Sequence, residues 1–213
     1  NKLQVIQIVL KSNIIKAIEI EAFFNLPNLT WIDLSNNQLQ KLNPHAFLDV
    51  PVLKELHFQC NNIGFLEKGN FNFIGKQNAF IGLNNNNISL IQSSIFDRKL
   101  EGELSVDLSA NAIESMSANF FDNHVFGYID LGCNPIEDLA RMCETNCGIR
   151  LMLVNGKFFD RENFENFTTW TESNNITLKE SNCINFDCNR LRNCSSKKAT
   201  SGFYYAILLV ILR

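Results

Sequence analysis

Apolar residues recur between residues 3 and 139 at a spacing that fits neither a helix nor an isolated strand. In the stretch LTWIDLSNNQLQKLNPHAF, residues 29–47, the aliphatic side chains are separated by three, two, five and three positions. An amphipathic helix would place them at every third or fourth residue, and a half-buried strand at every second. Asn37 lies inside this apolar series, which indicates that its amide has a structural role.

The pattern occurs six times. Counting the first apolar position of each unit as position 1, the units begin in steps of 23 to 25 residues at Val5, Leu29, Leu53, Asn78, Glu103 and Phe126. Positions 4, 6, 11 and 14 are apolar in every unit. Position 9 is always asparagine: Asn13, Asn37, Asn61, Asn86, Asn111 and Asn134. Position 19 is phenylalanine in the five complete units: Phe23, Phe47, Phe71, Phe96 and Phe121.

Such a repeat predicts a solenoid, because one unit cannot bury its apolar side chains without a neighbour. We expect a short strand at positions 3–5 of each unit, with positions 1, 4, 6, 11, 14 and 19 pointing inward. The chain must turn inward after the strand, and the backbone groups of a buried turn need partners. The asparagine amide, which has both donors and an acceptor, can supply them to its own turn and to the neighbouring unit.

The repeat resembles the leucine-rich repeat, LxxLxLxxNxL followed by LxxLxxxxFxxL, in its typical form of about 24 residues. It is most similar to extracellular members such as Toll-type receptor ectodomains, Slit-like proteins and the variable lymphocyte receptors of jawless fish. The resemblance implies an α/β repeat, a right-handed leucine-rich repeat solenoid (horseshoe) with a parallel concave sheet. We assign residues 1–139 to these repeats and expect that their N-terminal part is missing from this sequence.

Cysteines are concentrated near the C-terminal end. Six of the seven are Cys133, Cys143, Cys147, Cys183, Cys188 and Cys194. They lack the paired Cys or Cys–His spacing of zinc sites, so disulfides and no metal are expected. The resemblance implies a disulfide-rich C-terminal cap at residues 140–194, with its pairing left open. Cys60 lies far from the cluster, and we expect it to stay outside these disulfides.

Sequons, cysteines and an apolar tail bear on the cellular location of the chain. Glycosylation candidates in N-x-Ser/Thr sequons are Asn28, Asn87, Asn166, Asn175 and Asn193. Together with the cysteines they predict an extracellular or cell-surface chain. Residues 195–213 form a polar spacer and a hydrophobic tail, of which 203–212 are apolar without interruption. Three interpretations of this tail stay open: a lipid-anchor signal, part of a membrane-spanning helix, or a docked terminal strand or helix. We favour membrane attachment.

Charge and motifs exclude several classes of function. The net charge of −3 gives no electrostatic case for nucleic acid. No phosphate-binding loop or nucleotide fingerprint occurs, so no cofactor is expected. A Cys60–His57–Asp33 constellation can be drawn on adjacent strands, but no oxyanion donors accompany it. We therefore predict that the protein is not an enzyme.

Outward strand positions predict the binding surface. Candidate ligand-binding residues on the concave face are Trp31, Asp33, Glu55, His57, Phe80 and Tyr128. Large aromatics on a rigid surface are typical anchors for a protein partner. Asp33, Asp107 and Asp130 have a second interpretation, since they match the family phrase DLSxN, which shapes the strand end.

The family resemblance implies receptor-like recognition of a protein or glycan ligand on the concave or lateral face, in innate immunity or adhesion. The alternative is a structural or secreted matrix protein that does not signal. An intracellular scaffold would require reduced cysteines and unused sequons.

Overall fold

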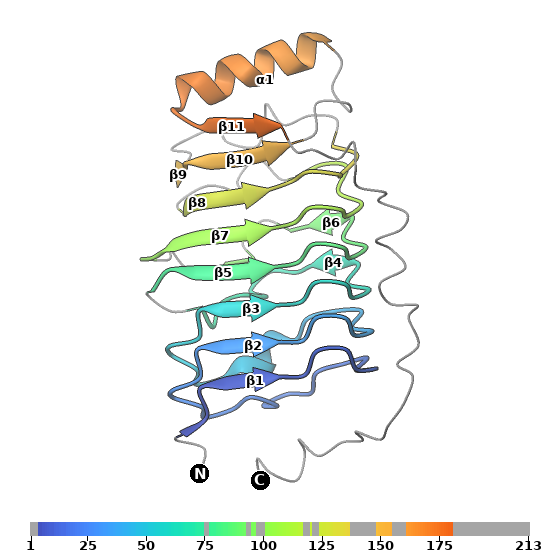
Figure 1. The fold of residues 1–213 in the computed structure, drawn as a ribbon, viewed down its shortest axis with the longest axis vertical. Helices are drawn as coiled ribbons and strands as arrows, with labels where there is room; N and C mark the ends of the chain where they lie inside the picture. The colour runs from blue at the N-terminus through green and yellow to red at the C-terminus, as the bar shows by residue number, and fades with distance from the viewer. Residues whose placement is uncertain are drawn as a thin grey trace.

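The structure, a computed structural model, describes residues 4–74, 77–92, 95–96, 101–116, 120, 124–136, 148–154 and 161–180. Its strands stack one above another as a parallel sheet (Figure 1). Along this main sheet the strands are β1 (Gln7–Val9), β2 (Trp31–Asp33), β3 (Glu55–His57), β5 (Ala79–Gly82), β7 (Glu103–Asp107), β8 (Val125–Asp130), β10 (Leu151–Val154) and β11 (Thr177–Glu180). The predicted parallel-sheet solenoid of about six turns is confirmed.

The strand register follows the repeat count. Ile32 pairs with Ile8 on one side and with Leu56 on the other, and the row continues through Ile81 and Val106 to Ile129. These residues occupy position 4 of the six units. From Ile32 onward each is at most 3% exposed, so the row forms the centre of the core.

Position 1 departs from the prediction in two units. Asn78 is exposed and Glu103 is half-buried, although position 1 was expected to point inward. Ala79 and Leu104, one residue later, are buried and pair with each other. A register shift follows between Leu104 and Ser105. It places Ser105 opposite Tyr128, so that position 3 of this unit again pairs with position 3 of the next unit. In the units that begin at Asn78 and Glu103, the buried residue at the start of the strand therefore lies one position later than in the other units.

The asparagines at position 9, called the ladder asparagines here, join neighbouring units in five of the six repeats. Asn86 Nδ2 donates to the Leu83 carbonyl of its own turn and to the Phe58 carbonyl of the preceding unit, at 2.9 and 3.0 Å. Its Oδ1 accepts from the Ile63 backbone N–H at 3.0 Å. The same three bonds recur at Asn37, Asn61, Asn111 and Asn134.

The first unit lacks part of this network. Within the described residues, Asn13 donates only to carbonyls of its own turn, those of Leu10 and Lys11. The solenoid also has exposed apolar side chains near β1: Ile6, Val9 and Ile14 are 56 to 65% exposed.

The residue before each ladder asparagine has a left-handed backbone, with φ between 53° and 59°. These residues are Ser12, Asn36, Cys60, Asn85, Ala110 and Cys133. This conformation is costly for side chains other than glycine, and asparagine tolerates it best. In return it directs the N–H toward the next unit: Cys60 N–H donates to the Asn84 carbonyl and Ala110 N–H to the Gly132 carbonyl.

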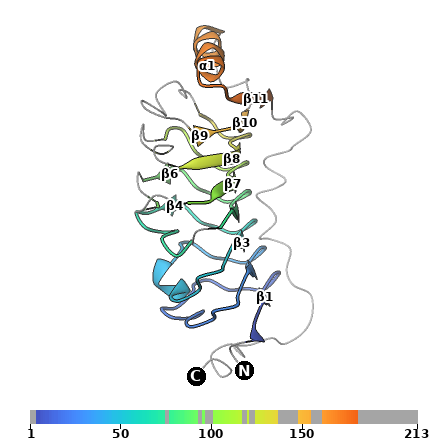
Figure 2. The same cartoon turned by 90° about the vertical axis from the view of Figure 1, so that its left-hand side faces the viewer.

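The far side of the solenoid is packed by aromatic rings. Phe23 stacks on Phe47 at 5.2 Å between ring centroids, and Phe71 contacts Phe96 at 5.7 Å. Phe73, which the repeat count did not single out, bridges the two pairs by stacking on Phe47 at 4.3 Å. Phe121 lies outside the described residues. Also on this side are the 3-10 helix η2 (Pro44–Phe47) and a small parallel sheet of β4 (Phe65–Leu66) and β6 (Leu90–Ile91) (Figure 2).

The main sheet continues into the segment predicted as the cap. β10 pairs with β8, β11 pairs with β10, and the short strand β9 (Gly148–Ile149) also pairs with β8. The helix α1 (Arg161–Ser173) lies beyond β11 at the end of the stack (Figure 1). Its Phe167 is 1% exposed and stacks on Trp170. Asn175 ends the helix in a left-handed conformation, which allows Ile176 N–H to donate to the Thr171 carbonyl.

Candidate binding site on the sheet face

The outward side of the main sheet, called the sheet face here, is built by positions 3, 5 and 7 of each unit. Trp31 lies in register with Glu55 and Glu55 with Phe80, so these three side chains occupy one row across β2, β3 and β5. His57 lies two residues beyond Glu55 on β3. Adjacent strands are about 4.8 Å apart, which brings all four side chains within reach of one another.

His57 joins the two large aromatics into one cluster. Its ring centroid lies 5.4 Å from that of Trp31 and 5.3 Å from that of Phe80, both in tilted geometry. All three side chains are partly exposed. Tyr128 lies apart: Ser105 separates it from Phe80 along the row, and its hydroxyl donates to Asp130 Oδ2 at 3.0 Å. The predicted aromatics thus form one cluster and one separate tyrosine.

A glutamine that the sequence analysis missed orients His57. Gln59 Nε2 lies 3.0 Å from His57 Nδ1. Because an amide nitrogen can only donate, Nδ1 accepts and the proton of the neutral ring lies on Nε2. Gln59 fits here because the neighbouring residue is Gly82, where a Cβ atom would lie 2.8 Å from the glutamine side chain. The sequence signal that could have predicted this contact is the glycine at position 5, an outward position that usually has a side chain.

Unused polar atoms remain in this cluster. His57 Nε2 and Gln59 Oε1 are buried and have no hydrogen-bond partner among the described residues. Glu55 Oε2 is 3.8 Å from His57 Nε2, too far for a hydrogen bond, and the Glu55 side chain is 46% exposed. The cluster therefore combines ring faces with one exposed carboxylate, that of Glu55.

The aspartates of the sheet face are part of the turns. Asp33, Asp107 and Asp130 each accept, through Oδ1, the backbone N–H two residues later, at 2.8 to 3.0 Å. Asp33 is also only 8% exposed. Its expected place among the ligand-binding residues is therefore not supported, because the carboxylate is buried and bonded to Ser35.

Asp107 and Asp130 are adjacent carboxylates on β7 and β8. Burial raises the pKa of Asp107, and the Ser109 hydrogen bonds oppose this only in part. Burial also raises the pKa of Asp130, and the charge of Asp107 adds to the effect. The Tyr128 hydroxyl, partly buried and beside Asp130, likewise has its pKa raised.

These shifts predict that Asp107→Asn stabilises the protein at neutral pH. Because the pKa is raised by folding, the folded chain binds more protons than the unfolded chain above the ordinary value of 3.8. The stability that Asp107 contributes is thus fully present below that value and is lost as pH rises through the folded pKa. Urea denaturation at pH 7 and pH 4 should show a higher midpoint for Asp107→Asn at pH 7 and a smaller difference at pH 4. A difference that grows at pH 4 would contradict the burial argument, and Glu114→Gln, which alters an exposed side chain, is the control.

Residues 4–63 match the family described as Leucine rich repeat. The units after residue 63 keep the same register and asparagine bonds. The chain therefore contains leucine-rich repeats. Leucine-rich repeats generally mediate protein binding, and the family is generally non-enzymatic. No curated protein matches the chain.

The residues of the sketched catalytic constellation have other partners. Gln59 bonds His57 Nδ1, Glu55 is the carboxylate near Nε2, and Asp33 Oδ1 accepts from Ser35 N–H. Within the described ranges, no group of three or more His, Cys, Asp or Glu side chains could hold a metal ion.

Only some of the disulfide and glycosylation candidates lie within the described residues. Cys133 is disulfide-bonded; Cys143, Cys147, Cys183, Cys188 and Cys194 lie outside the described residues, so the disulfide-rich cap stays a prediction. Asn28, Asn87 and Asn175 are exposed. Asn166 lies in α1, and Asn193 and the apolar run 203–212 lie outside the described residues. None of the helices in the described part of the chain has the length and hydropathy needed to cross a membrane.

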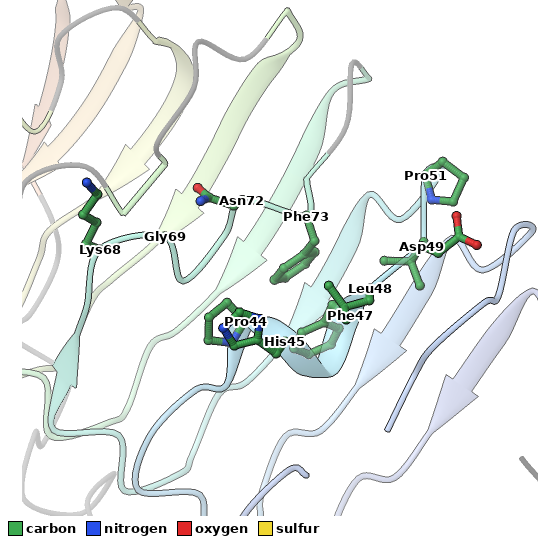
Figure 3. Close-up of a pocket in the computed structure, with 11 residues that line it drawn as sticks. Pro44, His45, Phe47, Leu48, Asp49, Pro51, Lys68, Gly69, Asn72 and Phe73 are labelled. Carbon is green, nitrogen blue, oxygen red and sulfur yellow. The ribbon is translucent and has the colours of Figure 1, made fainter. Parts of the chain in front are cut away.

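A groove of about 510 Å³ lies on the far side from the sheet face (Figure 3). Phe73, which stacks on the buried Phe47, contributes ring surface to it, and Leu48 adds an apolar side chain that is 39% exposed. His45, Asp49 and Lys68 are its exposed polar residues. With both charge signs around an apolar surface, the groove does not favour one class of ligand.

Proposed function

We propose that this chain is an extracellular or cell-surface, receptor-like module that binds a protein partner on its sheet face. The observation that carries the proposal is the Trp31–His57–Phe80 cluster, with Glu55 in the same row. Partly exposed aromatic side chains held by a rigid sheet lose little conformational entropy when a partner covers them. A role in innate immunity or adhesion is proposed from the family resemblance alone.

An extracellular location is proposed from the chemistry of the chain. The disulfide of Cys133 would need an oxidising compartment, and the exposed sequons Asn28, Asn87 and Asn175 could carry glycans. Membrane attachment through residues 203–212 belongs to the same proposal. Endoglycosidase treatment of the chain made in secreting cells should increase its electrophoretic mobility. Unchanged mobility would instead favour the intracellular scaffold.

The binding proposal is tested by capture from a display library of extracellular protein domains. The parent chain is compared with a sheet-face variant carrying Trp31→Ala, Phe80→Ala and Tyr128→Ala. A matched control carries Phe24→Ala, Phe65→Ala and Leu90→Ala, which truncate exposed side chains outside the main sheet. For a partner captured by the parent, we expect the sheet-face variant to lose at least tenfold in affinity and the control to keep it. Equal loss in both variants, or retention by the sheet-face variant, would contradict the proposal and favour the structural alternative.

A further inference from the structure

The sheet face is acidic where its aromatics lie. From β2 to β8, the outward positions 3, 5 and 7 contain Glu55, Asp33, Asp107 and Asp130 but neither lysine nor arginine. Three described basic side chains lie beside this area: Lys11, at position 7 of the first unit, Lys54, just before β3, and Arg150, whose Nη1 lies 2.7 Å from Glu103 Oε1. Since Asp33 is buried, Glu55 is the exposed acid within the aromatic cluster.

The exposed groups of the cluster fit a planar cation with several donors. Glu55, whose side chain is 46% exposed, offers two carboxylate oxygens, which a guanidinium group can bond with two parallel N–H donors. Trp31, in the same row as Glu55, presents the aromatic ring type that binds cations most strongly. A guanidinium group can stack on an indole while its N–H groups bond oxygens at its edge, whereas an ammonium group is a compact point charge.

We propose that the partner is held by an arginine side chain whose guanidinium stacks on Trp31 and donates hydrogen bonds to the Glu55 carboxylate. This inference rests on the proposed function, because it specifies the chemistry of the same binding site. His57 supports the site: held by Gln59 above Gly82, it packs between Trp31 and Phe80 and limits the movement of both rings.

The direct test uses a small probe. N-acetyl-arginine methylamide is titrated into the full ¹⁵N-labelled chain, and the indole N–H resonance of Trp31 is followed. N-acetyl-citrulline methylamide has nearly the same shape but no charge. We expect a saturable shift with the arginine probe, at least tenfold weaker binding of the citrulline probe, and at least tenfold weaker binding of the arginine probe to Glu55→Gln. Glu114→Gln, which removes an exposed charge outside the cluster, should bind like the parent.

Three results would overturn the inference: no shift at Trp31, equal binding of both probes, or parental affinity in Glu55→Gln. The capture experiment separates this failure from that of the proposed function. If the triple sheet-face variant loses its partner while Glu55→Gln retains it, the sheet face binds protein without the arginine contact. If the triple variant also retains the partner, the proposed function itself fails.

Discussion

Replacing Asn86 with alanine is expected to lower the free energy of unfolding by about 3 kcal/mol. The substitution leaves the buried Ile63 N–H without its acceptor. It also removes one of two amide donors from each of the Phe58 and Leu83 carbonyls, which Asn61 and Asn111 continue to bond. For a chain of this size the loss corresponds to a decrease in Tm of about 6–12 °C, measurable by circular dichroism.

Asn13→Ala is the matched control for this prediction. Asn13 bonds only carbonyls of its own turn among the described residues, and it is half-buried rather than buried. Its replacement should therefore cost no more than about 1 kcal/mol. An unchanged Tm for Asn86→Ala, or equal losses at both sites, would show that the bonds between units do not stabilise the solenoid.

Phe47→Ala is expected to have the largest effect on stability, a loss of roughly 3–5 kcal/mol. Phe47 is 1% exposed, and its ring contacts Phe23 of the preceding unit and Phe58 and Phe73 of the following unit. Truncation leaves a cavity that these rings, fixed by their own neighbours, cannot fill. Chemical denaturation should show the midpoint falling with little change in slope.

Phe24→Ala provides the comparison for Phe47. Phe24 is next to Phe23 in the sequence, but it is 40% exposed. Its truncation removes less buried area and opens no enclosed cavity, so we expect a loss of about 1 kcal/mol. If the two variants were equally destabilised, burial at position 19 would not explain the phenylalanine in each unit.

The core could be predicted from the sequence because one row of side chains repeats with one geometry. The position-4 register from Ile8 to Ile129 follows directly from aligning the asparagines. The inward direction of position 1 was wrong at Asn78 and Glu103, since the buried residue at the start of the strand lies one position later in these two units. The strands β10 and β11 were not predicted, because their sequence lacks the asparagine turn.

The binding cluster was harder to predict than the core. Repeat counting placed Trp31, Glu55, His57 and Phe80 on one face, and the structure brings their side chains together. Repeat counting could not show that Gln59 orients His57, because that contact depends on the absence of a side chain at Gly82 on the next strand. Repeat counting also grouped Tyr128 with the other aromatics, although Ser105 lies between Phe80 and Tyr128 in the position-3 row.

The unequal length of the units shows where this chain can be engineered. From the strand to the asparagine every unit has the same number of residues, and the difference between 23 and 25 arises elsewhere, between one asparagine and the next strand. The return segment therefore tolerates insertions and deletions, whereas the strand and its turn do not. A fluorophore or affinity handle placed near Glu114, which is exposed in such a segment, should report on binding without altering the surface that binds.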